Sequence, residues 1–236
     1  MSRGNPLRLR VDPGAIRDGR IVVGAASVRH LRVRRLRPGD PLVCFDDSGA
    51  EYLAVLRHID DYTAELELGE ASAPARESTL ELVLAQAALK GDHLDLVVEK
   101  ATELGASAIV IFHCERVVAR PSPARIERLR RIAASATQQS GRVRVPTVSG
   151  PVDLDEILIR GAILLHPGGP ALTGGMVETD VARLVVGPEG GFATAEVERA
   201  RAAGCIVAGL GPRVLRAETA GIVACALAQY LWGDAK

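Results

Sequence analysis

The sequence predicts an α/β protein in which a small β-rich unit precedes a larger unit built on a mostly parallel sheet. Three observations support this prediction. Apolar β-branched runs alternate with helical patterns from residue 79 onward, which is typical of a parallel sheet covered by helices. Short strands separated by turns fill residues 1–72. Residues 73–78, which lie between these regions, have the composition of a linker.

The first unit, residues 1–72, is expected to hold one helix among short strands. Ser27 is expected to cap a helix that ends before Pro38, because serine oxygen accepts a hydrogen bond from a free N–H of the first turn. The turn at residues 46–49 separates two apolar runs and predicts a hairpin. The expected strands are Leu7–Val11, Arg20–Val23, Pro41–Phe45, Glu51–Arg57 and Thr63–Leu68.

The second unit, residues 79–236, alternates strands and helices. Apolar residues recur at helical spacing from Leu94 to Leu104, and Gly105 follows at the position that favours a left-handed residue. Ser122 is expected to cap a helix in which Pro123 takes the first position, and Thr194 is expected to cap a helix that runs to about Ala203. The last helix is expected from about Glu218 to Trp232. The expected strands are Leu80–Leu84, Ala108–Phe112, Gly161–Leu165, Arg183–Val186 and Cys205–Ala208.

The amino-acid composition limits the kinds of partner that the protein is expected to bind. The chain has 236 residues, of which 47% are hydrophobic and 3% aromatic, so the core must be aliphatic. A net charge of zero argues against a protein that coats nucleic acid through bulk charge. Residues 1–37 nevertheless hold ten Arg against two Asp, and residues 113–146 hold eight Arg against two Glu. The bias of 26 Arg over three Lys suits RNA contact, although a GC-rich genome would produce the same bias.

Cysteine spacing and hydropathy indicate the compartment. Cys44, Cys114, Cys205 and Cys225 are far apart in the sequence and form no CxxC motif, which favours packed thiols in a reducing environment. No apolar run approaches the ~20 residues of a membrane span, and the N-terminus lacks the apolar core of a signal peptide. These features predict a cytoplasmic protein with no membrane partner.

Two segments near the C-terminus repeat one pattern of strand, glycine-rich loop and helix. They are LVVGPEGGF at residues 184–192 and LGPRVLRAETA at residues 210–220. Ligands of open α/β sheets bind in loops of this kind, at the carboxyl ends of strands, and glycine lets main-chain groups approach a ligand closely. Two ordinary tight turns between strand and helix would give the same pattern.

The two segments together resemble the signature of the SPOUT methyltransferases that methylate N3 of a uridine in small-subunit (16S) ribosomal RNA. The resemblance continues through LKGDHLDLVVEKATELG at residues 89–105, QQSGRVRVP at residues 138–146 and LLHP at residues 164–167. A weaker match covers residues 30–40. Gln138, Val117 and Ala217 depart from the residues usual in that family, and Arg34 stands where an apolar residue is more common.

The resemblance implies an architecture and an activity. It implies a C-terminal SPOUT domain whose chain forms a trefoil knot around S-adenosylmethionine, preceded by a small PUA-like β-barrel that helps to hold RNA. It also implies a homodimer that acts on 16S rRNA, within the small ribosomal subunit. The cofactor-binding residues that it implies are Leu165, His166, Pro167, Gly187, Glu189, Gly190, Gly191, Leu210, Gly211, Val214 and Leu215. The RNA-binding residues that it implies are His30, Arg32, Arg34, Arg35, Arg116, Gln139 and Arg142.

Transfer of a methyl group to N3 of uracil requires removal of the imide proton and stabilisation of the resulting anion. With no covalent step, positioning and electrostatics should dominate catalysis. Arg116, Arg142 and Arg216 stand at family motif positions and are the candidates for holding the target nucleotide. Glu189 and Glu218 suit either a structural role or a role as ligand or base. His166 could accept a proton, although a histidine at a strand end is more often a packed or hydrogen-bonded residue.

Other classes of protein fit less well. Gly209-Leu210-Gly211 starts like a dinucleotide-binding G-x-G-x-x-G, but the third glycine is missing and Pro212 interrupts the loop. Neither a P-loop nor a G-x-S-x-G motif occurs in the sequence. Two alternatives stay open, namely a non-catalytic RNA-binding protein that keeps a SPOUT shell and a SPOUT methyltransferase that acts on another RNA.

Overall fold

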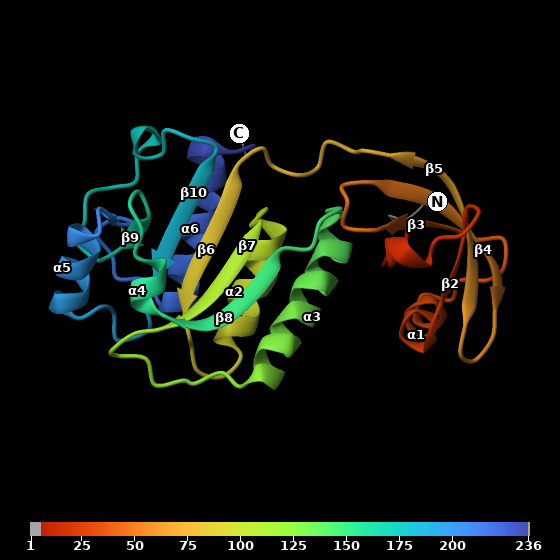
Figure 1. Cartoon of the computed structure of the whole chain (residues 1–236), viewed down its shortest axis with the longest axis horizontal. Helices are drawn as coiled ribbons and strands as arrows, with labels where there is room; N and C mark the ends of the chain where they lie inside the picture. Colours follow the sequence, from red (N-terminus) through yellow and green to blue (C-terminus); the bar gives the residue numbers. More distant parts are fainter. Residues whose placement is uncertain (1–5, 236) are drawn as a thin grey trace. The chain divides into compact units, whose positions relative to one another are not determined.

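The computed structural model describes residues 6–235, which divide into two compact units (Figure 1). The first unit comprises the chain up to Glu77 together with Thr137–Arg144, and the second comprises Ser78–Ala136 and the chain from Val145 onward. Hydrogen bonds explain why Thr137–Arg144 belongs with the first unit. The Glu77 carboxylate accepts from the backbone N–H of Val143 at 2.9 Å, and Gln138 accepts from the backbone N–H of Arg10 at 3.1 Å.

The first unit is a five-stranded sheet in the order β1-β3-β4-β5-β2, with one helix, α1. β1 runs parallel to β3, and the other neighbours are antiparallel. The expected hairpin is present as β3 and β4. The elements are β1 (Arg8–Arg10), the short helix η1 (Pro13–Ala15), β2 (Arg20–Val23), α1 (Ala25–Val33), β3 (Pro41–Phe45), β4 (Glu51–Ile59) and β5 (Ala64–Ser72).

Helix α1 covers the apolar face of this sheet. Its Val28 and Leu31 are buried with Leu42, Leu56 and Leu66 of the strands. The predicted cap at Ser27 is wrong, because α1 begins at Ala25 and its N-cap is Gly24, which makes no side-chain cap hydrogen bond. Alanine is the best helix former, so Ala25 and Ala26 extend the helix toward the N-terminus beyond the serine.

The second unit is a six-stranded sheet in the order β11-β9-β10-β6-β7-β8, and every neighbouring pair is parallel. The α/β architecture predicted for this region is therefore confirmed. Its elements are β6 (Glu81–Ala87), α2 (His93–Glu103), β7 (Ala108–His113), α3 (Pro123–Ser140), β8 (Thr147–Asp153), α4 (Leu154–Ile157), β9 (Ile163–Leu165), η2 (Gly174–Met176), β10 (Val181–Val186), α5 (Thr194–Ala202), β11 (Ile206–Ala208) and α6 (Ala217–Trp232).

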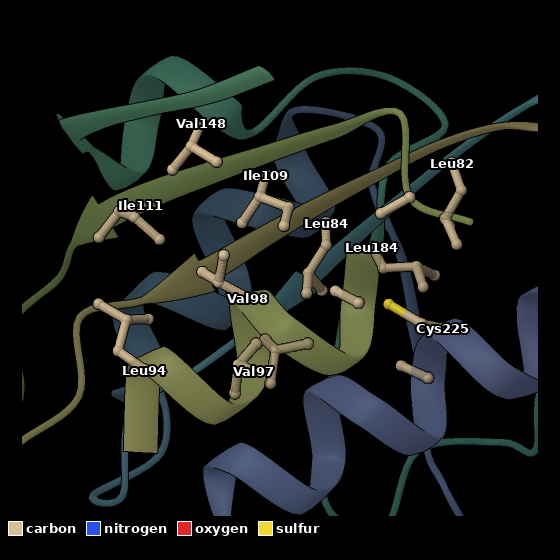
Figure 2. Packing of buried hydrophobic residues seen from close by; sticks show 14 of the residues in the cluster. Leu82, Leu84, Leu94, Val97, Val98, Ile109, Ile111, Val148, Leu184 and Cys225 are labelled. Carbon is tan, nitrogen blue, oxygen red and sulfur yellow. The ribbon is translucent and has the colours of Figure 1, made fainter. Parts of the chain in front are cut away.

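Helices cover both faces of the parallel sheet. Helices α2, α3 and α6 pack on one face, where Figure 2 shows Leu84 and Leu184 of the strands beside Val97 of α2 and Cys225 of α6. Helices α4 and α5 contribute to a second cluster on the opposite face, which contains Phe112. The core of both units is mainly aliphatic, as the composition indicates, and Phe45 and Phe112 are its largest fully buried side chains. None of the helices in residues 6–235 is both long and apolar enough to cross a membrane.

The helix ends predicted for this unit are confirmed in part. Gly105 follows α2 with φ of +84°, and the Ser122 hydroxyl accepts from the backbone N–H of Arg125 at 3.3 Å, so both predicted helix ends are confirmed. Thr194 is the first residue of α5 and not its cap, which is Ala193. Strand β8 and helix α4 were not predicted, because Gly150 and Pro151 interrupt the alternation of β8.

Candidate functional site

The three strands β11, β9 and β10 are adjacent and parallel, so their carboxyl ends meet at one edge of the sheet. The loops that follow them, residues 166–170, 187–193 and 209–216, enclose one side of a cavity of about 600 Å³. The first residues of α6, Ala217, Glu218 and Ala220, and His93 of α2 complete its lining. This volume lies in the range of small-molecule sites.

The loop after β9 and the loop after β11 cross, and their backbones are in contact. The N–H of His166 donates to the carbonyl of Ala208 at 2.8 Å, and the N–H of Gly209 donates to the carbonyl of Pro170 at 2.7 Å. A Cβ built on Gly209 would lie 2.6 Å from the oxygen of Gly169, and one built on Gly169 would lie 2.7 Å from the carbonyl carbon of Ala208. Only glycine fits on both sides of this crossing. The predicted trefoil knot stays a prediction.

The loop after β10 is held by its glycines and by Phe192. The Phe192 ring stacks on Phe112, with centroids 6.3 Å apart, and a Cβ built on Gly187 would lie only 3.0 Å from that ring. Gly191 has φ of +66°, which favours glycine. The loop therefore has a defined shape, set by one aromatic contact and a left-handed turn.

Arg116 joins this loop from the end of β7. Its guanidinium donates to the carbonyl of Gly190 at 2.9 Å, and a Cβ built on Gly190 would lie 3.2 Å from the Cβ of Arg116. The segment before Arg116 is fixed in turn by Glu196 of α5. One Glu196 carboxylate oxygen accepts from the backbone N–H of Glu115 and the other from that of Ala193, both at 2.8 Å. Glu196 is 1% exposed, so a buried carboxylate connects the Arg116 segment to the start of α5.

The structure gathers the predicted cofactor residues in one place. Arg216, predicted to hold the nucleotide, is the N-cap of α6 and lines the cavity with them. The eleven predicted cofactor residues that line the cavity are Leu165, His166, Pro167, Gly187, Glu189, Gly190, Gly191, Leu210, Gly211, Val214 and Leu215. Their contact with a cofactor stays a prediction, because the structure establishes only that they share one cavity.

Arg142 belongs to the first unit, and its guanidinium is held by Glu77. Its Nε and Nη2 atoms lie 3.0 and 2.7 Å from Glu77 Oε2, and Arg142 is 6% exposed. The same carboxylate accepts from the backbone N–H groups of Val143 and Arg144. Arg142 is thus part of an ion pair that orders residues 142–144, and its partner Glu77 could not be predicted from the sequence. Gln139 is exposed on α3.

The predicted RNA-binding residues of α1 differ in their surroundings. Arg32 pairs with Asp61 at 2.7 Å, whereas Arg34 and Arg35 are exposed and, within residues 6–235, have no ion-pair partner. Burial and the positive charge of Arg34 lower the pKa of His30. The neutral form of that imidazole is therefore favoured.

His93 and Glu218 are the site residues that sequence reasoning missed or left undecided. His93 is the first residue of α2, and its Nδ1 lies 3.3 Å from Oε1 of Glu218 in the first turn of α6. Both line the cavity. Residues 93 and 218 are far apart in the chain, so only the packing of α2 on α6 brings them together. The sequence contains one indication of this site. His93 stands at the start of the helix that follows β6, and β6 lies beside β10 in the same parallel sheet.

Cys114 lies near the site but is unsuited to nucleophilic attack. Burial, together with the negative charge of Glu196, raises the pKa of the Cys114 thiol to about 11. The thiolate is the nucleophilic form, so the protonated thiol is unreactive near neutral pH. This agrees with chemistry that uses positioning and charge without a covalent enzyme intermediate.

The lining of the cavity suits S-adenosylmethionine. A Cβ built on Gly191 or Gly211 meets no atom within 4 Å, so these glycines leave space open along the loops. Leu165, Leu210 and Leu215 offer apolar surface, while main-chain groups of the glycine loops offer hydrogen bonds that an adenine ring can use. The carboxylates of Glu189 and Glu218 favour a positively charged ligand.

Comparison with known proteins gives the same result along nearly the whole chain. Residues 76–229 match the model of an RNA methyltransferase domain, and residues 24–68 match that of an RNA methyltransferase PUA domain. A ribosomal RNA small subunit methyltransferase E of Synechocystis sp. is 32% identical over 231 residues, which cover 93% of this chain and 76% of the relative.

Solved structures resemble the whole chain. The ribosomal RNA small subunit methyltransferase E of Neisseria gonorrhoeae, bound to S-adenosylmethionine, aligns with a TM-score of 0.91 at 32% identity and covers 98% of this chain and 100% of its own. A Legionella pneumophila protein in complex with S-adenosylmethionine aligns with a TM-score of 0.88 at 28% identity, over 98% of this chain and 99% of its own.

Proposed function

Because the chain belongs to the family of ribosomal RNA small subunit methyltransferase E, we propose that it methylates N3 of a specific uridine in 16S rRNA, with S-adenosylmethionine as the methyl donor. The observation that supports this most directly is the single cavity at the carboxyl ends of β9, β10 and β11. It is lined by the eleven predicted cofactor residues and by Arg216 at the start of α6.

The cofactor is held by the three glycine-bearing loops in this proposal. Bound S-adenosylmethionine supplies a methyl group on a positively charged sulfur. The loop after β11, with Leu210 and Leu215, and the loop after β10, with Gly187–Gly191, hold its adenosine part through main-chain groups and apolar contact. Glu189 and Glu218 favour the positive charge of the ligand electrostatically.

Arg216 is the residue best placed to hold the uridine. It lines the cavity, and within residues 6–235 its guanidinium has no hydrogen-bond or ion-pair partner. A uracil that loses its N3 proton carries negative charge on the imide, which a guanidinium in a partly dry site stabilises. Arg116 is tied to the Gly190 carbonyl and so shapes the loop as well as adding positive charge. We retain Arg142 and Gln139 as RNA contacts, of which Arg142 must act from within its pair with Glu77.

The PUA-like unit is proposed to hold rRNA near the target through its arginines. Arg34 and Arg35 at the end of α1 have unpaired guanidiniums within the described part of the chain, as do the neighbouring Arg29 and Arg37. Arg32 and His30 are the weaker contacts of the predicted set, because Arg32 is engaged by Asp61 and a neutral imidazole attracts phosphate less. The substrate in this proposal is 16S rRNA within the small ribosomal subunit, which places the activity in the cytoplasm.

A homodimer is also proposed, and α6 offers the apolar surface for it. Val223, Leu227 and Tyr230 follow helical spacing and stay partly exposed, with Tyr230 60% exposed. The apolar face at residues 129–136 is unsuited to this role, because Leu129 and Ala133 are fully buried. Sedimentation at micromolar concentration tests this. A species of twice the chain mass of 24.9 kDa supports the dimer, and a clean monomer excludes it.

The activity is tested by mass mapping of modified nucleosides in 16S rRNA. The comparison uses a strain that lacks the gene, the same strain with the gene restored, and the same strain with the Arg216→Ala variant. A single methyluridine that is lost with the gene and returns only with the unaltered gene supports the proposal. Identical modification in all three strains would refute it. Calorimetry with S-adenosylmethionine distinguishes an enzyme from a non-catalytic protein that keeps the fold, because the non-catalytic protein would bind RNA but no cofactor.

A further inference from the structure

His93 and Glu218 form a pair that has no assigned role in the proposed reaction. Nδ1 of His93 lies 3.3 Å from Oε1 of Glu218, and both residues line the cavity. The Glu218 side chain is 10% exposed and that of His93 is 48% exposed. The carboxylate is therefore enclosed beneath a ring that is accessible on one side.

This geometry fixes the properties of the ring. A neutral imidazole has one N–H donor and one acceptor nitrogen, and the partner of one nitrogen decides which is which. A carboxylate oxygen 3.3 Å from Nδ1 favours the tautomer with its proton on Nδ1, which leaves the lone pair on Nε2. Glu218 lies in the first turn of α6, so the contact fixes the ring against a residue that the helix itself holds in place.

We propose that Nε2 of His93 is the proton acceptor of the methyl transfer, and that Glu218 is the residue that positions it. This inference rests on the proposed function. The N3–H bond of uridine breaks and its proton moves to Nε2 of His93. The N3 electron pair forms the new bond to the methyl carbon as the bond from that carbon to sulfur breaks, and the electron pair of that bond stays on sulfur. The imidazolium then releases its proton to water, so no further reactant is needed.

The other titratable groups of the cavity are less suited to this task. His166 also presents a free Nε2, because its Nδ1 lies 2.8 Å from the carbonyl of Pro167, but within residues 6–235 it has no carboxylate partner. Glu189 is exposed and is approached by the backbone N–H of Lys90 at 3.4 Å. Arg213 and Arg216 complete the charged lining and favour the deprotonated uracil rather than accept its proton.

The test compares four single variants of the full chain, and the double variant His93→Asn with Glu218→Gln, in single-turnover methylation of small ribosomal subunits that lack the modification. His93→Asn keeps a donor near the Nδ1 position but removes Nε2. Glu218→Gln keeps an acceptor for Nδ1–H but removes the charge. His166→Asn tests the rival ring. His58→Asn is the matched control, because His58 lies 3.9 Å from the Asp60 carboxylate but belongs to the first unit, outside the cavity.

The proposal predicts a loss of about 100-fold or more for His93→Asn at neutral pH, with affinity for S-adenosylmethionine, measured by calorimetry, unchanged within about threefold. The rate of that variant should rise with pH up to the ionisation of the uridine, because the variant has no proton acceptor at this position. Glu218→Gln should lose at least about tenfold, and the double variant should lose no more than His93→Asn alone, because the pair acts as a unit.

A second measurement does not depend on activity. Nitrogen-15 NMR of the histidine rings should show the neutral His93 protonated at Nδ1 in the unaltered protein and in Glu218→Gln, and a loss of that preference in Glu218→Ala. A mainly Nε2-protonated ring in the unaltered protein would overturn the positioning role. Unchanged turnover in His93→Asn, or a large loss confined to His166→Asn or Glu218→Gln, would overturn the assignment of His93. Absence of methylation by the unaltered enzyme would instead reject the proposed function.

Discussion

Replacement of Glu196 by glutamine tests how a buried carboxylate supports the cofactor loops. Glu196 is 1% exposed, and its two oxygens accept separate backbone N–H groups, from Glu115 and Ala193, at 2.8 Å each. A glutamine side chain has one acceptor oxygen and one NH2 donor, so only one of the two N–H groups keeps a partner. The other N–H group then faces a donor in a buried site.

The expected loss in the free energy of unfolding follows from these two contacts. One charge-assisted hydrogen bond is weakened and one is lost, and a buried N–H group left without a partner costs about 1–3 kcal/mol by itself. We therefore expect Glu196→Gln to lower the free energy of unfolding of the second unit by about 2–4 kcal/mol. The Glu115 segment carries Arg116, whose guanidinium holds the Gly190 carbonyl, so affinity for S-adenosylmethionine should fall as well.

Urea unfolding followed by fluorescence measures this change, because Trp232 at the end of α6 is the only tryptophan and reports on the second unit. With a urea dependence of about 2 kcal/mol per molar, the midpoint should fall by about 1–2 M. Glu156→Gln is the matched control. Glu156 caps α4 in the same way, accepting from the N–H of Asp153 at 2.9 Å, but it is exposed and makes no second bridge. Equal, small shifts in both variants would refute the reasoning.

Four further predictions use other parts of the chain. Gly209→Ala should destabilise the second unit by about 1–3 kcal/mol in the same urea assay, because its Cβ would lie 2.6 Å from the Gly169 oxygen. The control Gly175→Ala should change stability by less than about 0.5 kcal/mol, because a Cβ at Gly175 meets no atom within 4 Å. Cys114 has a pKa of about 11, so its alkylation, followed by mass spectrometry, should be slow at pH 7 and about tenfold faster per pH unit up to that value; a rate already constant at pH 8 would contradict this. The pKa of His30 is lowered from 6.5, so the unfolded chain takes up this proton first and stability should fall as the pH drops below about 6.5; His30→Gln should flatten that part of the stability profile. Arg142→Ala should spare cofactor affinity and lower methyl transfer, with Glu77→Gln as the comparison that removes the charge of the Glu77 carboxylate and keeps the guanidinium. Equal loss of cofactor binding in Arg142→Ala would reject its role toward RNA.

The sequence was informative wherever a local pattern decides the structure. The parallel sheet followed from apolar runs that alternate with amphipathic helices, and the loops at residues 187–191 and 210–215 could be located because glycine and proline end those strands. Strand β8 escaped prediction because Gly150 and Pro151 interrupt its pattern, and its place beside β7 is set by tertiary pairing. The grouping of Thr137–Arg144 with the first unit likewise depends on hydrogen bonds to distant residues such as Glu77.

Pairs of polar side chains that only tertiary packing brings together could not be predicted from the sequence, for a related reason. His93 and Glu218 each look like ordinary residues in the first turn of a helix, and neither has a neighbour in the chain that marks it as catalytic. Their meeting depends on the position of α2 against α6, which is fixed by buried aliphatic side chains such as Val97 and Cys225 (Figure 2). A pattern of apolar residues predicts that two helices pack, but it does not predict which polar residues then face each other.

The three arginines at family motif positions show how partners distinguish residues that look alike in the sequence. Arg142 is held by Glu77 through two nitrogen atoms, and Arg116 is bound to the Gly190 carbonyl. Arg216 caps α6 beside the cavity, and within the described residues its guanidinium has no hydrogen-bond or ion-pair partner. A cation that already has a partner must give up that contact before it can stabilise a new anion, whereas an unpaired cation gives up only water. We therefore expect the uracil anion to depend most on Arg216, and we expect Arg116 and Arg142 to contribute less to its stabilisation.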